Sequence, residues 1–308
     1  MVATPFAFTK RPDGIMKDPL RVFRHLSSTP ADAVRWACVL EATAPKPGNV
    51  FPGRGFADLN HGDFIAAAEI AARDLGRSSD PITVRMLRAV DQMKSHLGTN
   101  VNLGIILLLG PLVAADEART DTMHAADLDG WRKLIRRVLQ QFDGQDGKRI
   151  FQAIQRASAG GLGSSESMDL NETHDSIDIL HAMNLAMDRD RVALQYSDGF
   201  DDLCREVVPI LNKSIRDCGD VLTGICQAHL RLMASAPDSL IGRKNGPKVA
   251  NEVQQRAQQI DPTDVDSVES FDRFLREGGH QLNPGTTADL IAAALYVLLR
   301  TPQEDDQS

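Results

Sequence analysis

The first group of residues that could do chemistry lies between positions 41 and 63. Lys46 stands between two prolines, shortly after Glu41. Fixed proline torsions limit the freedom of the backbone around Lys46, which lowers the entropic cost of holding its ammonium against a phosphate. His61 and Asp63 follow at the start of a predicted helix, where such a pair can transfer protons or hold a metal. The alternatives are a turn with a solvated lysine, which suits residues 44–49 better when they are taken alone, and an aspartate that only caps its helix.

Two further segments offer groups of opposite charge. A glycine-rich loop around Gly161 permits close approach of the backbone to a ligand, and its Asp169 supplies the type of oxygen that Mg²⁺ prefers. This loop lacks the Lys and Ser/Thr of a P-loop, and a surface loop explains it equally well. Arg243 and Lys244 add the local positive charge that an anionic ligand needs, although a solvated loop leading into a helix explains them nearly as well.

Two strongly apolar segments with polar first turns give the strongest functional signal. Residues 105–113 follow a head that contains Asn100 and Asn102, and residues 290–299 follow one that contains Thr286, Thr287 and Asp289. A helix that is apolar all round must be buried, so its unpaired N–H donors and positive dipole end point into the protein interior. Side by side, two such ends would bind phosphates or a carboxylate-held metal. For either helix alone, a core helix with a capping head is an equally good explanation.

The remaining sequence predicts the helices that must position these groups. Helical periodicity and capping residues occur over 30–42, 60–75, 81–97, 131–142, 146–158, 174–188, 199–216, 219–235, 247–259 and 264–277. Alternating β-branched runs between hairpin turns are missing, and only 5% of the residues are aromatic. We therefore predict an all-α fold. It has a single multi-helix domain at 29–301 that contains the two buried, polar-headed helices, an N-terminal extension at 1–28 and a polar tail at 302–308.

Composition restricts the possible partners. A formal net charge of -8 argues against a nucleic-acid surface, which requires an extended basic stripe. The first thirty residues contain no apolar run, which excludes a secretory signal, and residues 103–115 are too short to cross a bilayer. The four cysteines form no Cys-x-x-Cys pair. We expect a cytoplasmic protein without a membrane or nucleic-acid partner, and the sequence leaves a homo-oligomer open.

Taken in order, these segments resemble the triphosphoribosyl-dephospho-CoA synthase family. The resemblance covers roughly residues 31–300 and rests on motifs that are strong in combination: Glu41, Pro45–Gly48, His61 with Asp63, Gly98-x-Asn100-x-x-x-Gly104, the glycine loop with Asp169, Asp238 to Lys244, and Pro284 to Leu290. It implies an all-α fold and transfer of the 5-triphosphoribosyl group of ATP to the ribose 2′-hydroxyl of dephospho-CoA, with release of adenine. The product would be a prosthetic-group precursor for carrier proteins of the citrate or malonate lyase type.

Two motifs depart from the family pattern. Asn100-Val101-Asn102-Leu103-Gly104 stands where the family typically has Asn-Thr-His-Lys-Gly, so a titratable group and a cation are lost. Pro284-Gly285-Thr286-Thr287-Ala288-Asp289 replaces the usual Pro-Gly-Gly-Ser-Ala-Asp. We interpret the chain as a divergent branch whose acceptor is dephospho-CoA or a related cofactor precursor.

The implied reaction assigns roles to the candidate residues. Displacing adenine passes through an oxocarbenium-like state, which needs a neutralised triphosphate and proton transfer to the base and from the hydroxyl. Mg²⁺ held by Asp63, Asp169 and Asp289 is expected to neutralise ATP together with Lys46 and Lys244, and Glu41 or His61 to move protons. The expected phosphate-binding residues also include Asn100, Asn102, Gly161, Arg243, Thr286 and Thr287. Lys46 is expected to matter for binding far more than for folding.

Two other functions remain possible at this stage. An all-α metal-dependent phosphohydrolase would use His174 and Asp175, with His124 and Asp188 as arbitrary further ligands. A non-catalytic helical nucleotide-binding protein would do no chemistry. Products separate the three: free adenine indicates the transferase, inorganic phosphate or pyrophosphate the hydrolase, and neither the binding protein.

Overall fold

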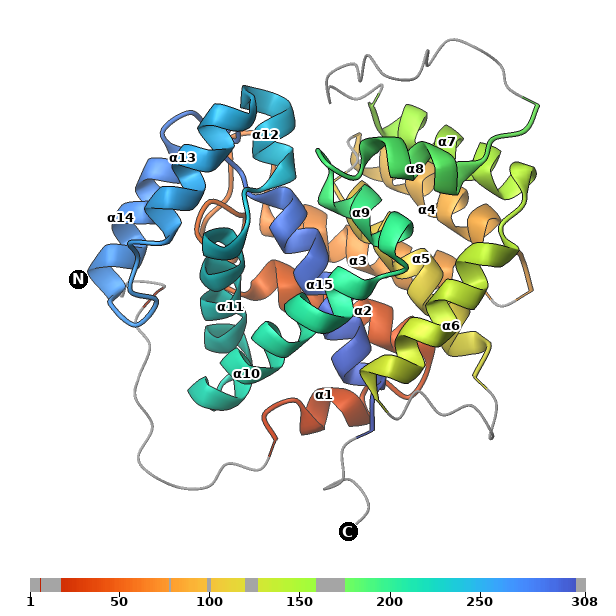
Figure 1. Cartoon of the computed structure of the whole chain (residues 1–308). Coiled ribbons are helices and arrows are strands. Elements are labelled where there is room, and N and C mark those ends of the chain that lie inside the picture. The colour runs from red at the N-terminus through yellow and green to blue at the C-terminus, as the bar shows by residue number, and fades with distance from the viewer. Residues whose placement is uncertain are drawn as a thin grey trace.

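A computed structural model describes residues 6, 18–77, 79–98, 101–119, 127–158 and 175–302, and these are all-α, as the sequence predicts. Over this part of the chain only two isolated β-bridges occur, Phe51 with Arg54 and Phe56 with Leu59. The helices, shown in Figure 1, are α1 (Arg21–His25), α2 (Pro30–Thr43), α3 (His61–Leu75), α4 (Ile82–Leu97), α5 (Leu103–Glu117), α6 (Leu128–Gln141), α7 (Gly144–Ser158), α8 (Ile179–Ala186), α9 (Arg191–Asp198), η1 (Leu203–Val207), α10 (Val208–Cys218), α11 (Val221–Ser235), α12 (Ser239–Asn245), α13 (Pro247–Ala257), α14 (Val265–Arg276) and α15 (Gly285–Arg300).

Local sequence signals set the boundaries of the first long helices. Thr29 accepts a hydrogen bond from the Asp32 N–H and Pro30 occupies the first turn of α2. Asn60 opens α3 in a reciprocal capping box with Asp63. Gly98 ends α4 with a left-handed φ of 68°. The predicted limits of these helices are confirmed to within a residue or two.

The helix predicted over 199–216 is observed from residue 201 to 218, but it contains a π-helical turn that the sequence did not predict. Gly199 and Phe200 both have positive φ, 70° and 61°, and they end α9 in a turn. The next segment, η1, is π-helical, and the Val208 N–H reaches back to the Leu203 carbonyl. Pro209 follows directly and has no N–H to continue an ordinary α-helical ladder, which accounts for the wider turn. Residues 239–245 are also helical, as α12, where a solvated loop was the alternative explanation.

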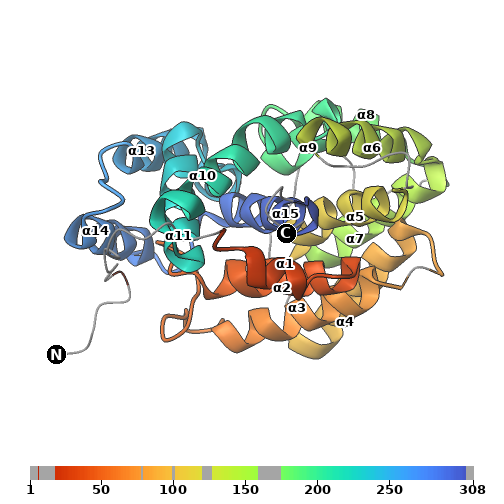
Figure 2. The ribbon, with the colours of Figure 1, turned by 90° about the horizontal axis from the view of Figure 1, so that it is seen from below.

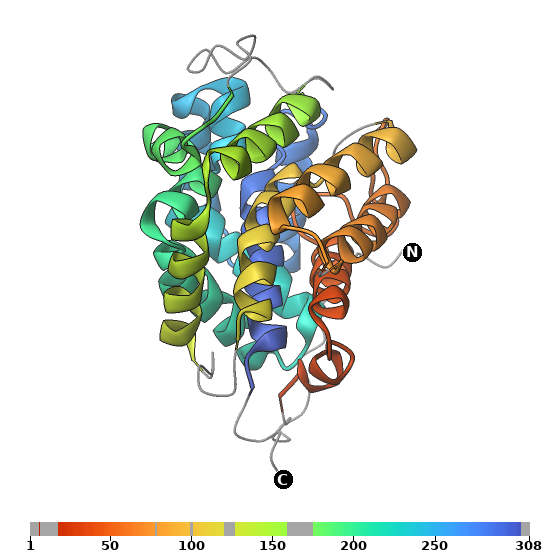
Figure 3. The same ribbon diagram turned by 90° about the vertical axis from the view of Figure 1, so that its right-hand side faces the viewer.

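Two helices form the middle layer of the molecule, α5 and α15. Figures 2 and 3 show them between α2, α3 and α4 on one side and α6, α9 and α10 on the other. Nearly every residue of both is buried, including Ile105–Val113 and Leu290–Leu299. None of the described helices is both long and apolar enough to cross a membrane. Burial inside the protein therefore accounts for the apolar character of α5 and α15.

The middle helices run parallel, and contacts at both ends fix their register. A Cβ placed on Gly104 would overlap the carboxylate of Asp289, so the first turns of α5 and α15 touch. At the other end, the Asp116 carboxylate accepts hydrogen bonds from the Tyr296 hydroxyl at 2.8 Å and from Arg300 Nε at 2.6 Å. The N-termini of α5 and α15 consequently lie at the same end of the molecule.

A proline inside α5 explains how a neighbouring helix is attached to this layer. Pro111 cannot donate to the Leu107 carbonyl four residues earlier. The buried hydroxyl of Tyr196 donates to that carbonyl instead, at 2.7 Å. The interior thus satisfies the carbonyl that the sequence leaves open, and α9 is held against α5.

Candidate functional site

The predicted Glu41 and Lys46 are brought together at the C-terminal end of α2. Lys46 Nζ lies 2.9 Å from Glu41 Oε1, and the lysine side chain is fully buried. The same ammonium donates to the backbone carbonyl of Glu41 and lies 3.5 Å from that of Ala44, so it also satisfies carbonyls left open where the helix ends. The alternative of a turn with a solvated lysine is therefore wrong, and the buried, paired ammonium indicates that Lys46 also supports the fold.

The loop that carries Lys46 is held against the segment that precedes α15. Gly48 has a φ of 75°, and its N–H donates to the buried carboxylate of Asp272 at 2.8 Å. Its carbonyl accepts from Asn283 Nδ2 at 3.0 Å. A side chain on Gly48 would come within 2.9 Å of Pro284, so only glycine fits between them. The first and last motifs of the sequence meet here.

His61 lies beside the Glu41–Lys46 pair, whereas Asp63 is occupied in helix capping. His61 Nε2 is 3.3 Å from Thr43 Oγ1 at the end of α2. Burial and the Lys46 charge lower the pKa of His61, and the Glu41 charge opposes them only in part, so the imidazole is neutral at neutral pH. Asp63 Oδ2 accepts from the Asn60 N–H at 2.8 Å, which is the capping role that the sequence offered as the alternative.

Asp289 faces this group from α15. Burial, followed by the negative charges of Glu41, Asp238 and Asp190, raises the pKa of Asp289 well above its usual range, while Arg243 opposes the shift. Among the described residues Asp289 forms no hydrogen bond or ion pair. A carboxyl group with negative neighbours and no donor of its own is a favourable place for a cation or a proton.

The N-terminus of α5, against which Asp289 packs, has no side-chain cap among the described residues. Asn102 is the N-cap residue, but its side chain makes no capping bond. It is only 1% exposed, and its Oδ1 has no hydrogen-bond partner among the described residues. Buried amide oxygens and first-turn N–H groups are normally paired, so this helix end has the character of an anion or ligand site.

The N-terminus of α15 is capped by Asp238, a residue that sequence reasoning placed in a motif but not in the site. Its Oδ2 accepts from both the N–H and the hydroxyl of Thr287, each at 2.8 Å, and its Oδ1 accepts from the N–H of Leu240 and of Ile241. Thr286 Oγ1 accepts a hydrogen bond from Ser239 at 3.0 Å. The two threonines thus join α12 to α15, and Asp238 fixes the angle at which Asp289 is presented.

Arg243 and Lys244 lie at the rim. Arg243 is half exposed, and one of its guanidinium nitrogens lies 2.5 Å from Asp190 Oδ2. Lys244 Nζ donates to the His280 carbonyl at 3.0 Å, and burial lowers the pKa of this lysine. Each cation already has a partner, so binding an anion would require it to exchange that partner or share it.

The sequence-based prediction of site residues did not include one buried histidine. His229 of α11 is fully buried, and neither ring nitrogen has a hydrogen-bond partner among the described residues. Burial and the charge of Lys46 lower its pKa well below the usual value. A lone histidine within an apolar helix gave no signal, because only the packing of α11 beside the 44–50 loop brings it near Lys46.

Three predicted site residues, Asn100, Gly161 and Asp169, lie outside the described residues. Within the described ranges no three His, Cys, Asp or Glu side chains gather as a metal site. Mg²⁺ is commonly held by one or two carboxylates together with substrate phosphates, and Asp289 with Glu41 nearby fits that kind of site. Of the phosphohydrolase candidates, His124 and His174 also fall outside, and Asp175 and Asp188 are both exposed on the surface.

Comparison with known proteins identifies a family and a fold. The model of the family described as ATP:dephospho-CoA triphosphoribosyl transferase matches residues 27–307. A crystal structure described as that of a triphosphoribosyl-dephospho-CoA synthase from Archaeoglobus fulgidus superposes with a TM-score of 0.57, at 22% identity, over 77% of this chain and 95% of the other. No curated protein matches the chain. The family match supports a transferase rather than a phosphohydrolase, and the structural match supports the all-α fold.

Proposed function

Since the chain belongs to the ATP:dephospho-CoA triphosphoribosyl transferase family, we propose that it moves the triphosphoribosyl group of ATP to a hydroxyl of a nucleotide-like acceptor. The C1′–N9 bond of ATP breaks, and its electron pair leaves with adenine, which takes up a proton. The acceptor oxygen bonds to C1′ and loses its proton. Dephospho-CoA is the first acceptor to test, and the lost cation and titratable group at Asn102-Leu103 make a related cofactor precursor the second.

The observation that carries this proposal is the meeting of Asp289 with the uncapped N-terminus of α5, beside the Glu41–Lys46 pair and His61. Segments separated by more than two hundred residues supply these groups, and they converge at one end of the helical layers. The helix end and Asn102 offer positive potential to phosphates. Asp289 supplies an oxygen ligand whose pairing with a cation would offset the repulsion from its acidic neighbours.

His61 is our candidate for proton transfer. Its lowered pKa leaves a free lone pair at neutral pH, so it can accept the proton of the attacking hydroxyl. The Thr43 hydroxyl holds the ring in position. Glu41 lies close enough to Asp289 and His61 to influence both, and it stabilises positive charge that develops on C1′ or on the imidazole.

Mg²⁺, when bound with ATP, would neutralise the triphosphate. In this proposal Asp289 would hold the ion, and Lys244 and Arg243 would bind the outer phosphate oxygens from the rim. Asn102 orients the phosphates at the α5 end, and Thr286 and Thr287 keep α15 in place. Asp63 and Asp169 remain candidate ligands from outside this group. Four unpaired cysteines favour a reducing compartment, and we place the reaction in the cytoplasm.

Chromatographic detection of free adenine tests the proposal directly. Purified protein is incubated with ATP, Mg²⁺ and dephospho-CoA, and we expect adenine and a triphosphoribosylated acceptor in equal amounts. His61→Gln should lose most of this activity, while His96→Gln, an exposed histidine on α4, should keep it. Release of phosphate or pyrophosphate without adenine, or binding of ATP without any product, would remove the proposed reaction.

A further inference from the structure

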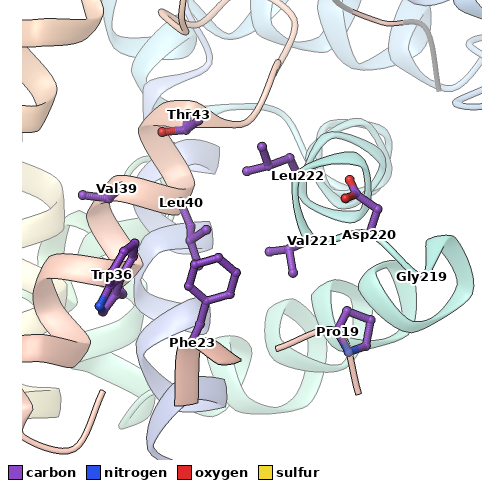
Figure 4. Close-up of a pocket in the computed structure, with 10 residues that line it drawn as sticks. All are labelled: Pro19, Phe23, Trp36, Val39, Leu40, Thr43, Gly219, Asp220, Val221 and Leu222. Atoms are coloured by element: carbon purple, nitrogen blue, oxygen red, sulfur yellow. The ribbon is translucent and has the colours of Figure 1, made fainter. Parts of the chain in front are cut away.

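An apolar pocket opens between α2 and the start of α11. Its volume is about 440 Å³, within the range of small-molecule sites. Figure 4 shows Phe23, Leu40, Val221 and Leu222 directed into it from three different elements, α1, α2 and α11. Phe23 packs edge-on against Trp36, with ring centroids 5.3 Å apart. This wall is partly exposed to solvent, so it offers an apolar surface that a ligand could cover.

One end of the pocket reaches the candidate site. Thr43 lines the pocket at the end of α2, and its hydroxyl is the group that contacts His61. Trp36 lies seven residues earlier on the same helix, which corresponds to about 10 Å along the axis. The pocket is therefore elongated, and it leads away from the reacting atoms toward α1.

The chemistry of the lining selects an uncharged ligand. Among the ten lining residues, all within the described ranges, only Asp220 carries a charge. Its carboxylate accepts from the Thr223 N–H at 2.8 Å and would repel phosphate, although it can accept a further N–H donor. Phosphates thus fit the α5 end of the site, and a neutral chain with amide groups fits the pocket.

We propose that this pocket holds the neutral, amide-containing arm of the acceptor while the acceptor hydroxyl lies at His61. The inference rests on the proposed function. Dephospho-CoA has such an arm, which its diphosphate joins to the nucleotide, whereas ADP has the same nucleotide and diphosphate without it. The arm would bury its apolar atoms against Trp36, Val39 and Leu222, and its N–H groups would reach Asp220.

The adenine ring of ATP is a less suitable occupant. A planar base fills only part of a pocket that extends over two turns of α2, and its C1′ attachment must stay at the reaction centre. A second copy of the chain could also cover the exposed wall. In the following test, adenine and a second copy of the chain each give a result that differs from the one expected for the acceptor arm.

The experiment compares dephospho-CoA with ADP by calorimetry. The wild-type protein should bind dephospho-CoA on the order of tenfold more tightly than ADP. Leu222→Trp fills the pocket and should abolish this preference, with ADP and ATP affinities within twofold of wild type. Leu185→Trp is the matched control, because Leu185 is an exposed leucine on α8 outside the pocket. Val39→Trp repeats the test from the opposite wall if Leu222→Trp does not fold.

Several results would overturn the inference. Equal affinity of the wild-type protein for dephospho-CoA and ADP would show that the arm does not bind in the pocket. An unchanged preference of Leu222→Trp for dephospho-CoA would show the same. Weaker ATP binding in Leu222→Trp assigns the pocket to adenine, and a change of oligomeric state assigns it to a second copy. If adenine is released but dephospho-CoA binds no more tightly than ADP, the proposed function stands and the pocket inference fails. If dephospho-CoA binds more tightly but no adenine is released, the pocket inference stands and the proposed function fails.

Discussion

Asp289 and Asp116 lie at opposite ends of the same pair of parallel helices, and their surroundings are opposite as well. Asp116 is fully buried and accepts hydrogen bonds from Tyr296, Arg300 and Arg119. Asp289 has three acidic neighbours and no donor among the described residues. The protein therefore neutralises a buried aspartate between these helices at the end remote from the candidate site, whereas the partly buried Asp289 has no such partner among the described residues. We take this difference as support for two proposals, that Asp116 stabilises the fold and that Asp289 binds a ligand.

The largest effect is expected from Asp289→Asn. Removing the negative charge takes away the cation ligand, and adenine release should fall by about a thousandfold, or ~4 kcal/mol. The variant should fold, because asparagine has the same size. Turnover is measured at saturating ATP and Mg²⁺. Activity near the wild-type value would show that Asp289 does not bind a catalytic cation. The functional difference from Asp116 would then be wrong.

Asp116→Asn should give the opposite result. Without the carboxylate, Arg300 and Arg119 lose their buried counter-charge, and the free energy of unfolding should fall by about 3 kcal/mol. Turnover per folded molecule should stay within a few-fold of wild type. Urea unfolding gives the first quantity and adenine release the second. A variant that is stable but inactive would contradict the assignment of Asp116 to the fold.

Lys46→Met sharpens the comparison at the end of the helices where the candidate site lies, because Lys46, unlike Asp289, is paired there. We expect a loss of about 3 kcal/mol in stability, since Glu41 is left buried without its partner. The double variant Lys46→Met/Glu41→Gln should recover much of it. Lys213→Met, which removes an exposed pair with Asp217, should change stability by less than about 0.5 kcal/mol. Normal stability in Lys46→Met would restore the original prediction of a binding lysine.

Gly104→Ala tests the contact between the two helix ends. The added methyl group would displace the Asp289 carboxylate, and adenine release should fall by about 10- to 100-fold with a smaller loss of stability. Gly242→Ala is the matched control on α12, where the nearest atom, Ala250 Cβ, leaves room at 3.7 Å. Equal activities of the two variants would mean that the position of the Asp289 carboxylate has no importance.

The smallest effect is a pH-dependent difference in stability between the ligand-free wild type and Asp289→Asn. The folded-state pKa of Asp289 is raised, so ionisation favours the unfolded chain once the pH exceeds its ordinary pKa of about 3.9. Asp289→Asn should match wild type near pH 4 and melt a few degrees higher by pH 8. Mg²⁺ with ATP should reduce this gap. Thermal melts across this pH range check the sign of the difference in melting temperature. A difference that does not depend on pH would contradict the raised pKa of Asp289.

Much of the fold could be predicted because its signals are local. The caps at Thr29 and Asn60 and the glycine at 98 set helix ends through hydrogen bonds within a few residues. The sequence did not predict features whose signal is weak or tertiary. At 199–216 the interior of η1 depends on Pro209 and on the Gln195 side chain, which accepts from the Leu203 N–H. α12 is short, and it forms because Asp238 also binds Thr287 of another helix.

The amino-acid sequence by itself determined that the chain is helical, that α5 and α15 must be buried, and which family the motifs belong to, because periodicity, apolar content and motif order are properties of residue types. It also named Glu41, His61, Asn102 and Asp289 as candidate site residues. Only the tertiary structure decided how these groups are used. It paired Lys46 with Glu41 in the interior and Asp63 with the cap of α3, and among the described residues it gave Asp289 no partner. The physical reason is that the cost of a buried charge depends on which groups packing brings beside it, and those groups come from distant parts of the chain.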